Sequence, residues 1–199
     1  MIRDAEIKNA SDYQELLENM RRKIVELKPE MMNEPHFKFI PLNYRRFLRI
    51  YKTYRMSDNL REALQSVEQN QLWLVLTEDS CGDSAQTLPM IARMAEVNPK
   101  IELKFLYREQ NPDLMDHYLT DGKRSIPKLI AFDGEGVELF QWGPRPAPAH
   151  ILFKRSRENG LSKEQILQKL HAWYAADRCK SLEAELLAIL RAIHQQQDV

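Results

Sequence analysis

The chain has 199 residues, of which 43% are hydrophobic and 29% are charged, and this ordinary composition excludes disordered, collagen-like and low-complexity proteins. Its 29 basic and 29 acidic residues cancel, so no overall field draws the chain toward nucleic acid or an anionic membrane. The sequence has no apolar run of 18 or more residues, and its first ten residues lack the apolar segment of a secretory signal. We therefore expect a cytoplasmic protein without a membrane partner.

Helices are expected throughout the first third of the chain. Apolar residues recur at helical spacing over residues 11–28, where Ser11 and Gln14 have the form of a capping box. Two further helices are predicted over residues 43–56 and 58–68. Together these segments define an expected N-terminal helical extension, residues 1–69.

The pattern changes to that of a sheet near residue 70. A continuous apolar run over 72–76 predicts a strand buried on both faces, and a helix over 83–97 follows with Pro89 inside it, where we expect a kink. Further elements are predicted at 101–107 (strand), Pro112 onward (short helix), 127–132 (strand) and 137–142 (strand). This order predicts an α/β core over residues 70–148, with one parallel strand pair and an antiparallel hairpin.

The last quarter of the chain reads as a C-terminal helical extension, residues 149–199, packed on the core. Residues 143–160 contain three prolines and a basic run, and we expect an irregular connection there. Ser162 and Gln165 form a second capping-box pattern at the start of a helix. One more helix is expected to present Leu182, Leu186, Ile189 and Ile193 on one side.

Cys81 is the strongest candidate for chemistry. It lies at the end of the first strand, directly before a helix, where free backbone N–H groups and the helix dipole favour the thiolate. Ser84 could donate a hydrogen bond to the sulfur. Glu78, Asp79 and Asp83 act in the opposite direction, because nearby carboxylates raise a cysteine pKa. The sequence leaves the sign of the shift open, and a free cysteine is also commonly a buried small hydrophobe.

The order of these motifs resembles the thioredoxin superfamily. In that family a strand leads into a Cys-x-x-Cys or Cys-x-x-Ser turn that opens a kinked helix, and a cis-proline loop enters an antiparallel hairpin. The matching positions are Cys81-Gly82-Asp83-Ser84 for the turn, Pro89 for the kink, Ile126-Pro127 for the loop, and Gly143 after the hairpin. The resemblance implies a thioredoxin-like fold, a mixed parallel and antiparallel sheet flanked by helices.

A narrower resemblance rests on residues 77–86, 119–122, 125–129 and 142–146. These segments look like a bacterial thioredoxin-like subfamily with a Glu-Asp-Trp-Cys-Gly-Asp turn and an N-terminal helical extension. Three positions depart from the family: Ser84 replaces the second cysteine, Ser80 stands where tryptophan is usual, and Val75 replaces a buried acid. Because Ser84 replaces the second cysteine, no disulfide can form within the turn, and the two-cysteine reductase cycle of thioredoxin is not available.

The resemblance, with this departure, implies a monothiol thiol–disulfide oxidoreductase. Cys81 would attack a protein or low-molecular-weight disulfide, and Ser84 and the helix N-terminus would stabilise its thiolate. The expected substrate-binding residues are Gly82, Asp83, Ile126 and Pro127. No bound cofactor is expected, and glutathione or another external thiol is the candidate resolving partner. Cys179 is expected to be structural or incidental, although a resolving role stays open.

The alternative hypothesis is a redox-inactive thioredoxin-fold protein that acts as an interaction module or forms a homo-oligomer through its helical extensions. Its motivation is the missing second cysteine and the acidic residues around Cys81. Whether the protein is an enzyme therefore stays open at this point.

The remaining motifs favour structural roles. Residues 43–56 interleave aromatic and basic side chains, a pattern that occurs in nucleic-acid binding but more often buries an aromatic stripe that would include Leu48, so nucleic acid is not an expected partner. Five histidines show no paired metal spacing, and no metal is expected. Arg145 either presents a cation near Cys81 or belongs to a segment that ends the sheet rigidly.

Overall fold

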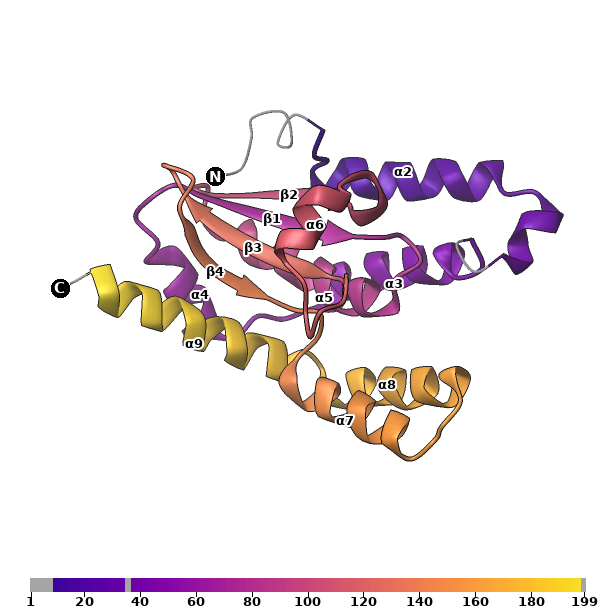
Figure 1. Ribbon diagram of the computed structural model, residues 1–199. Coiled ribbons are helices and arrows are strands. Elements are labelled where there is room, and N and C mark those ends of the chain that lie inside the picture. The colour runs from indigo at the N-terminus through magenta and orange to yellow at the C-terminus, as the bar shows by residue number, and fades with distance from the viewer. Residues whose placement is uncertain (1–8, 35–36, 198–199) are drawn as a thin grey trace.

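The computed structural model describes residues 9–34 and 37–197. A four-stranded sheet in the order β2-β1-β3-β4 lies at its centre (Figure 1). β1 (Gln71–Thr77) and β2 (Ile101–Tyr107) are parallel, whereas β3 (Lys128–Asp133) pairs antiparallel with both β1 and β4 (Glu138–Trp142). The parallel pair and the antiparallel hairpin predicted from the sequence are both confirmed.

Helices cover both faces of this sheet, and β1 is buried between them. Trp73 and Val75 face one core, which also holds side chains of α3 (Ile40–Thr53), α4 (Asp58–Gln65) and α5 (Gly82–Ala95). Leu74 and Leu76 face the other core, beneath α6 (Pro112–His117). All four side chains are fully buried. The continuous apolar run therefore serves both faces, as in strands covered on each side.

The first described helix, α2 (Tyr13–Glu26), begins one residue later than the capping box predicted from Ser11 and Gln14. Asp12 is the N-cap, and Glu15 returns the hydrogen bond to it. The reason is that Ser11 pairs with Phe105 through two backbone hydrogen bonds of 2.8 and 2.9 Å. Ser11 therefore belongs to the edge of the sheet, and the helix starts after it.

The aromatic stripe of α3 packs into the core as expected. Phe47 and Tyr54 are buried, and Tyr51 stacks on Tyr13 of α2 with ring centroids 4.9 Å apart. Leu48, expected on the same side, is instead 44% exposed. The helix itself starts at Ile40 because Pro41 is accommodated in its first turn, where the missing N–H has no intrahelical partner to lose.

The prediction of an irregular connection over residues 143–160 is wrong. This segment contains α7 (Ala147–Glu158), with Pro146 as N-cap and Pro148 in the first turn. Prolines at those positions remove no intrahelical hydrogen bond, so they open a helix here.

α8 (Lys163–Asp177) follows with the predicted Ser162–Gln165 capping box, and α7 and α8 bury a small cluster of their own below the sheet (Figure 1). α9 (Lys180–Gln197) then runs back beneath α4, where Leu182 and Leu186 are buried. No helix within the described ranges is long and apolar enough to cross a membrane.

Candidate active-site turn at Cys81

Cys81 lies at the N-cap of α5, directly after the turn that follows β1. Its Sγ accepts a hydrogen bond from the backbone N–H of Ser84 at 3.4 Å and donates one to the carbonyl oxygen of Ile126 at 3.5 Å. The peptide bond between Ile126 and Pro127 is cis. The fold thus brings the cysteine turn and the proline loop, 45 residues apart, into direct contact.

Ser84 and Gly82 are closely enclosed. Ser84 is fully buried, and its Oγ accepts a 2.8 Å hydrogen bond from the hydroxyl of Thr77. Gly82 lies against His171 of α8, and a Cβ at this position would be 3.1 Å from His171 Cε1. A side chain on residue 82 would therefore push the imidazole aside. His171 is a neighbour of the turn that the sequence analysis did not identify.

Asp83 connects the turn to the C-terminal helices. Arg145 donates to its Oδ2 from Nε at 3.1 Å and from Nη2 at 2.5 Å, and the Tyr174 hydroxyl donates to its Oδ1 at 2.7 Å. The side chains of Asp83 and Arg145 are each only 12% exposed. Of the two hypotheses left open for Arg145, the structure supports a cation beside the turn. Both carboxylate oxygens of Asp83 already have partners within the chain.

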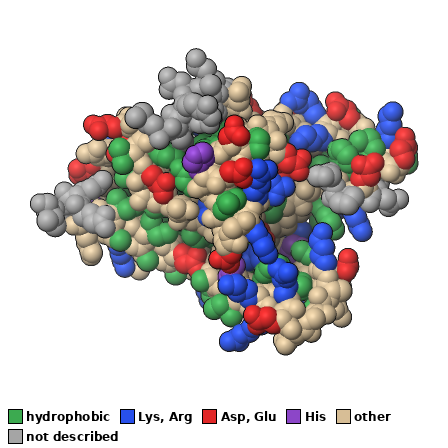
Figure 2. All heavy atoms as spheres, viewed as in Figure 1, with side chains coloured by type: hydrophobic (Ala, Val, Ile, Leu, Met, Phe, Trp, Pro, Cys, Tyr) green, Lys and Arg blue, Asp and Glu red, His purple; other side chains and the backbone are tan. Residues whose placement is uncertain are grey.

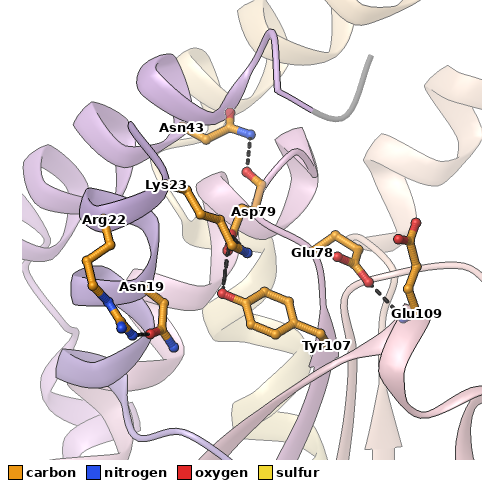
Figure 3. A network of polar contacts seen from close by, with 8 residues as sticks. All are labelled: Asn19, Arg22, Lys23, Asn43, Glu78, Asp79, Tyr107 and Glu109. Carbon is orange, nitrogen blue, oxygen red and sulfur yellow. Dashed lines mark hydrogen bonds and ion pairs between the residues drawn. The ribbon is translucent and has the colours of Figure 1, made fainter. Parts of the chain in front are cut away.

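Asp79 connects the same turn to the N-terminal helices (Figure 3). Its side chain is 4% exposed and accepts from Lys23 of α2 at 2.5 Å and from the Tyr107 hydroxyl at 2.9 Å. Its backbone carbonyl accepts from Asn43 of α3 at 2.9 Å. Burial and the Asp79 carboxylate both raise the pKa of Tyr107, so the phenol stays a hydrogen-bond donor. The ammonium group of Lys23 balances the negative charge of Asp79.

The pKa of Cys81 is raised above that of an ordinary thiol, which is one of the two directions that the sequence left open. Burial of the thiol is the largest cause, and the Asp83 carboxylate adds to it. Hydrogen bonds from Ser84 act in the opposite direction but do not outweigh burial. Glu78 has a raised pKa of its own, mainly because of burial, and accepts a hydrogen bond from the Glu109 backbone N–H. The resting thiol of Cys81 is accordingly protonated at neutral pH.

A cavity of about 460 Å³ adjoins the proline loop on the side of α7. Its wall includes Ser125, which precedes Ile126, together with Lys123, Arg145 and Arg157. Asp121 also lines it and pairs with Lys154 at 3.6 Å. Figure 2 shows Lys and Arg side chains gathered between the end of the sheet and α7. Glu158 lines the cavity as well, so its wall holds Lys123, Arg145, Lys154 and Arg157 against Asp121 and Glu158, an excess of basic side chains.

Cys179 is free, as is Cys81, and lies at the junction of α8 and α9. Within the part of the chain that the structure describes, no three His, Cys, Asp or Glu side chains are grouped to hold a metal ion.

Comparisons with known proteins agree with this architecture. A thioredoxin family model matches residues 37–157, and no curated protein sequence gives a match. The crystal structure of PA1234, a Pseudomonas aeruginosa protein of unknown function, matches with a TM-score of 0.63 at 19% identity, over 96% of this chain and 99% of its own. An HIV epitope-scaffold matches with a TM-score of 0.56 at 18% identity, over 92% of this chain and 99% of its own. At such identities these two structures bear on the fold alone.

Proposed function

Since the chain belongs to the thioredoxin family, whose model spans more than half of it, we propose that it carries out monothiol thiol–disulfide exchange through Cys81. The observation that carries the proposal is the 3.5 Å contact between Cys81 Sγ and the Ile126 carbonyl, beside Pro127. A substrate chain lying along this loop would bring its disulfide to the thiol. On its other side the sulfur accepts the hydrogen bond from the Ser84 backbone N–H.

The exchange proceeds in two steps, and each step breaks one disulfide bond and forms another. The Cys81 thiolate attacks one sulfur of the substrate disulfide, a bond forms between the two sulfurs, and the other substrate sulfur leaves as a thiolate that takes up a proton. An external thiol such as glutathione, as its thiolate, then attacks the mixed disulfide on the sulfur that came from the substrate. Cys81 leaves as a thiolate and is reprotonated. Ser84, in the place of a second cysteine, cannot carry out that second step.

The raised pKa of Cys81 sets the rate of the first step. At neutral pH only a small fraction of the thiol is ionised, so exchange is slow. A thiolate of higher pKa is intrinsically more nucleophilic, which offsets part of that loss. Exchange should therefore accelerate as the pH rises.

The basic cavity beside the proline loop supports an anionic low-molecular-weight thiol as the exchanging group. Lys123 and Arg157 line it, and carboxylates of a glutathione moiety would find cations there. Arg145 also lines the cavity, but its charge is already paired with Asp83. We further propose, on the turn over residues 78–84 and on helices α2–α4 before it, that the chain belongs to the bacterial thioredoxin-like subfamily with a Glu-Asp-Trp-Cys-Gly-Asp turn. Substitution of that tryptophan by Ser80 leaves a more polar surround.

The proposed roles of the two cysteines can be separated by matched variants. Cys81→Ser is expected to reduce glutathione-dependent deglutathionylation of a model peptide to the uncatalysed rate, whereas Cys179→Ser is expected to retain nearly all activity. The physical reason is that only the Cys81 sulfur contacts the proline loop. Initial rates at about pH 8.5, near the pKa of a free thiol, provide the measurement. Equal loss of activity in the two variants would rule out the assignment.

A redox-inactive interaction module is the second candidate, and one observation favours it. Arg145, in the segment before α7, and Tyr174 of α8 bind both oxygens of Asp83, so these hydrogen bonds tie the turn to the C-terminal part of the chain. This alternative expects Cys81→Ser to leave partner binding unchanged and the wild-type protein to show no exchange at any pH.

A further inference from the structure

A second cavity, of about 720 Å³, lies between α3, α5 and α8 and does not include Cys81 in its lining. Its wall is strongly cationic, with four arginines: Arg46, Arg49, Arg55 and Arg178. His171 also lines the cavity, but burial and the nearby Arg46 lower the pKa of its imidazole. No aspartate or glutamate is among the described residues that line it. Two of these arginines come from α3, the helix whose interleaved basic residues stood out in the sequence.

The arginines of this cavity lack acidic partners among residues 9–34 and 37–197. Arg46 donates to the side-chain oxygen of Asn43 at 3.1 Å, and Arg55 donates to the backbone carbonyls of Lys52 and Tyr54. Burial and the nearby Arg49 both lower the pKa of Arg46, so its cation is held against repulsion and partial desolvation. An anion between the guanidinium groups would offset both effects, because an opposite charge nearby favours the charged form of the guanidinium.

The position of Arg178 adds an independent observation. It is the C-cap of α8 and has φ 49° and ψ 42°, a left-handed conformation that usually belongs to glycine or asparagine. An ordinary side chain there costs about 1 kcal/mol or more. Arg178 thus ends α8 in a strained conformation and lines the cationic cavity.

The floor of the cavity is apolar. Ile50 and Met90, both buried, line it, and Tyr54 and Ala175 also belong to the cavity wall. Its volume lies within the range of about 300–1,000 Å³ that is usual for small-molecule sites. Guanidinium groups bind phosphate oxygens bidentately, and the apolar floor suits an organic moiety.

We propose that this cavity binds a phosphorylated organic molecule of about the size of a nucleoside diphosphate. Arg46, Arg49 and Arg178 hold the phosphates, and the organic part lies on Ile50 and Met90. The proposal is independent of exchange at Cys81. The site nevertheless adjoins the cysteine turn, because His171 and Tyr174 line the cavity and also contact Gly82 and Asp83, respectively.

The test is isothermal titration calorimetry of the full chain with adenosine diphosphate and, separately, with inorganic pyrophosphate. Arg49→Gln and Arg178→Gln should each weaken binding of adenosine diphosphate about tenfold or more, because a hydrogen bond to a charged group contributes about 1.5–3 kcal/mol. Arg45→Gln is the matched control. Arg45 is an exposed arginine of the same helix that is absent from the cavity wall and donates to the Pro41 carbonyl, so its substitution should leave the affinity unchanged.

The outcomes separate the sources of the anion. Tighter binding of adenosine diphosphate than of pyrophosphate, lost in both cavity variants and kept in Arg45→Gln, supports the proposal. Equal affinity for adenosine diphosphate and pyrophosphate would overturn the proposal that the cavity recognises an organic moiety, and it would leave a site for inorganic phosphate groups. Absence of binding at millimolar probe, or equal weakening by all three substitutions, would overturn the site itself. The three substituted residues, Arg45, Arg49 and Arg178, are exposed, so the variants are expected to fold. A thermal melt of each variant checks this.

Discussion

Replacing Gly143 with alanine is expected to lower the free energy of unfolding by about 3 kcal/mol or more. Gly143 has φ +118°, and a Cβ there would lie 2.2 Å from the carbonyl oxygen of Pro127. This obstacle is backbone, so no side-chain rotation can relieve it. The loop beside Cys81 or the end of β4 would have to move instead. Urea denaturation of the variant and the parent measures the loss.

Gly160→Ala is the control for this substitution. Gly160 has φ +70°, but no atom lies within 4 Å of the position that its Cβ would occupy. Alanine there should cost only the left-handed conformation, about 1 kcal/mol. If the two variants lose the same stability, the close approach to Pro127 is not what requires glycine at position 143.

Arg145→Met is expected to destabilise the protein by about 3 kcal/mol, because it leaves the carboxylate of Asp83 nearly buried without its cation. Tyr174 would remain the partner of that carboxylate, with one hydrogen bond of 2.7 Å. The double variant Arg145→Met/Asp83→Asn removes both charges and should recover a large part of the loss. Chemical denaturation of the two variants checks this order.

Arg157→Met provides the matched control for Arg145→Met. The guanidinium of Arg157 also lies over the Phe153 ring, at 5.9 Å compared with 4.3 Å for Arg145, but Arg157 is exposed and has no contact with Asp83. Its replacement should change stability by no more than about 0.5 kcal/mol. A similar effect of the two substitutions would mean that packing on Phe153, and not the pair with Asp83, accounts for the loss.

The helices at both ends of the chain hold the Cys81 turn from opposite sides. Lys23 and Asn43 of the N-terminal helices bind Asp79, whereas Arg145 and Tyr174 bind Asp83. Two of the three acidic residues around the cysteine, Asp79 and Asp83, thus anchor the terminal segments, whereas Glu78 binds the backbone N–H of Glu109. This arrangement explains why the turn is closely packed and why burial dominates the pKa of its thiol.

The meeting of Cys81 with the proline loop was implied by the resemblance to the thioredoxin superfamily, whereas local patterns in the sequence predict the sheet. The apolar run over β1 and the order of elements carry that information, because strand connections obey strong topological rules. The prediction at α7 was wrong because prolines such as Pro146 and Pro148 are as typical of a helix start as of an irregular loop. Proline position within the first turn, and not proline count, decides between the two.

Contacts with the C-terminal helices could not be predicted in the same way. Tyr174 and His171 lie about 90 residues from the turn that they touch, and no spacing in the sequence indicates which side of α8 meets α5. The sequence indicated Arg145 as a candidate cation and Asp83 as a substrate-binding residue, but it did not indicate that the two form an ion pair. The arginine-lined cavity likewise depends on how α3 and α8 pack, because neither helix forms it alone.

The most direct test of the central claim is the reaction of Cys179→Ser protein with glutathione disulfide over a range of about pH 6 to 10, followed by intact mass spectrometry. We expect one glutathione on Cys81, at a rate that rises about tenfold per pH unit and continues to rise past about pH 8.5, where a free thiol levels off. Asp83→Asn should shift the profile to lower pH, because the Asp83 carboxylate helps to raise the pKa of the thiol. Absence of an adduct on the folded protein, when the urea-unfolded protein reacts, would contradict exchange through Cys81.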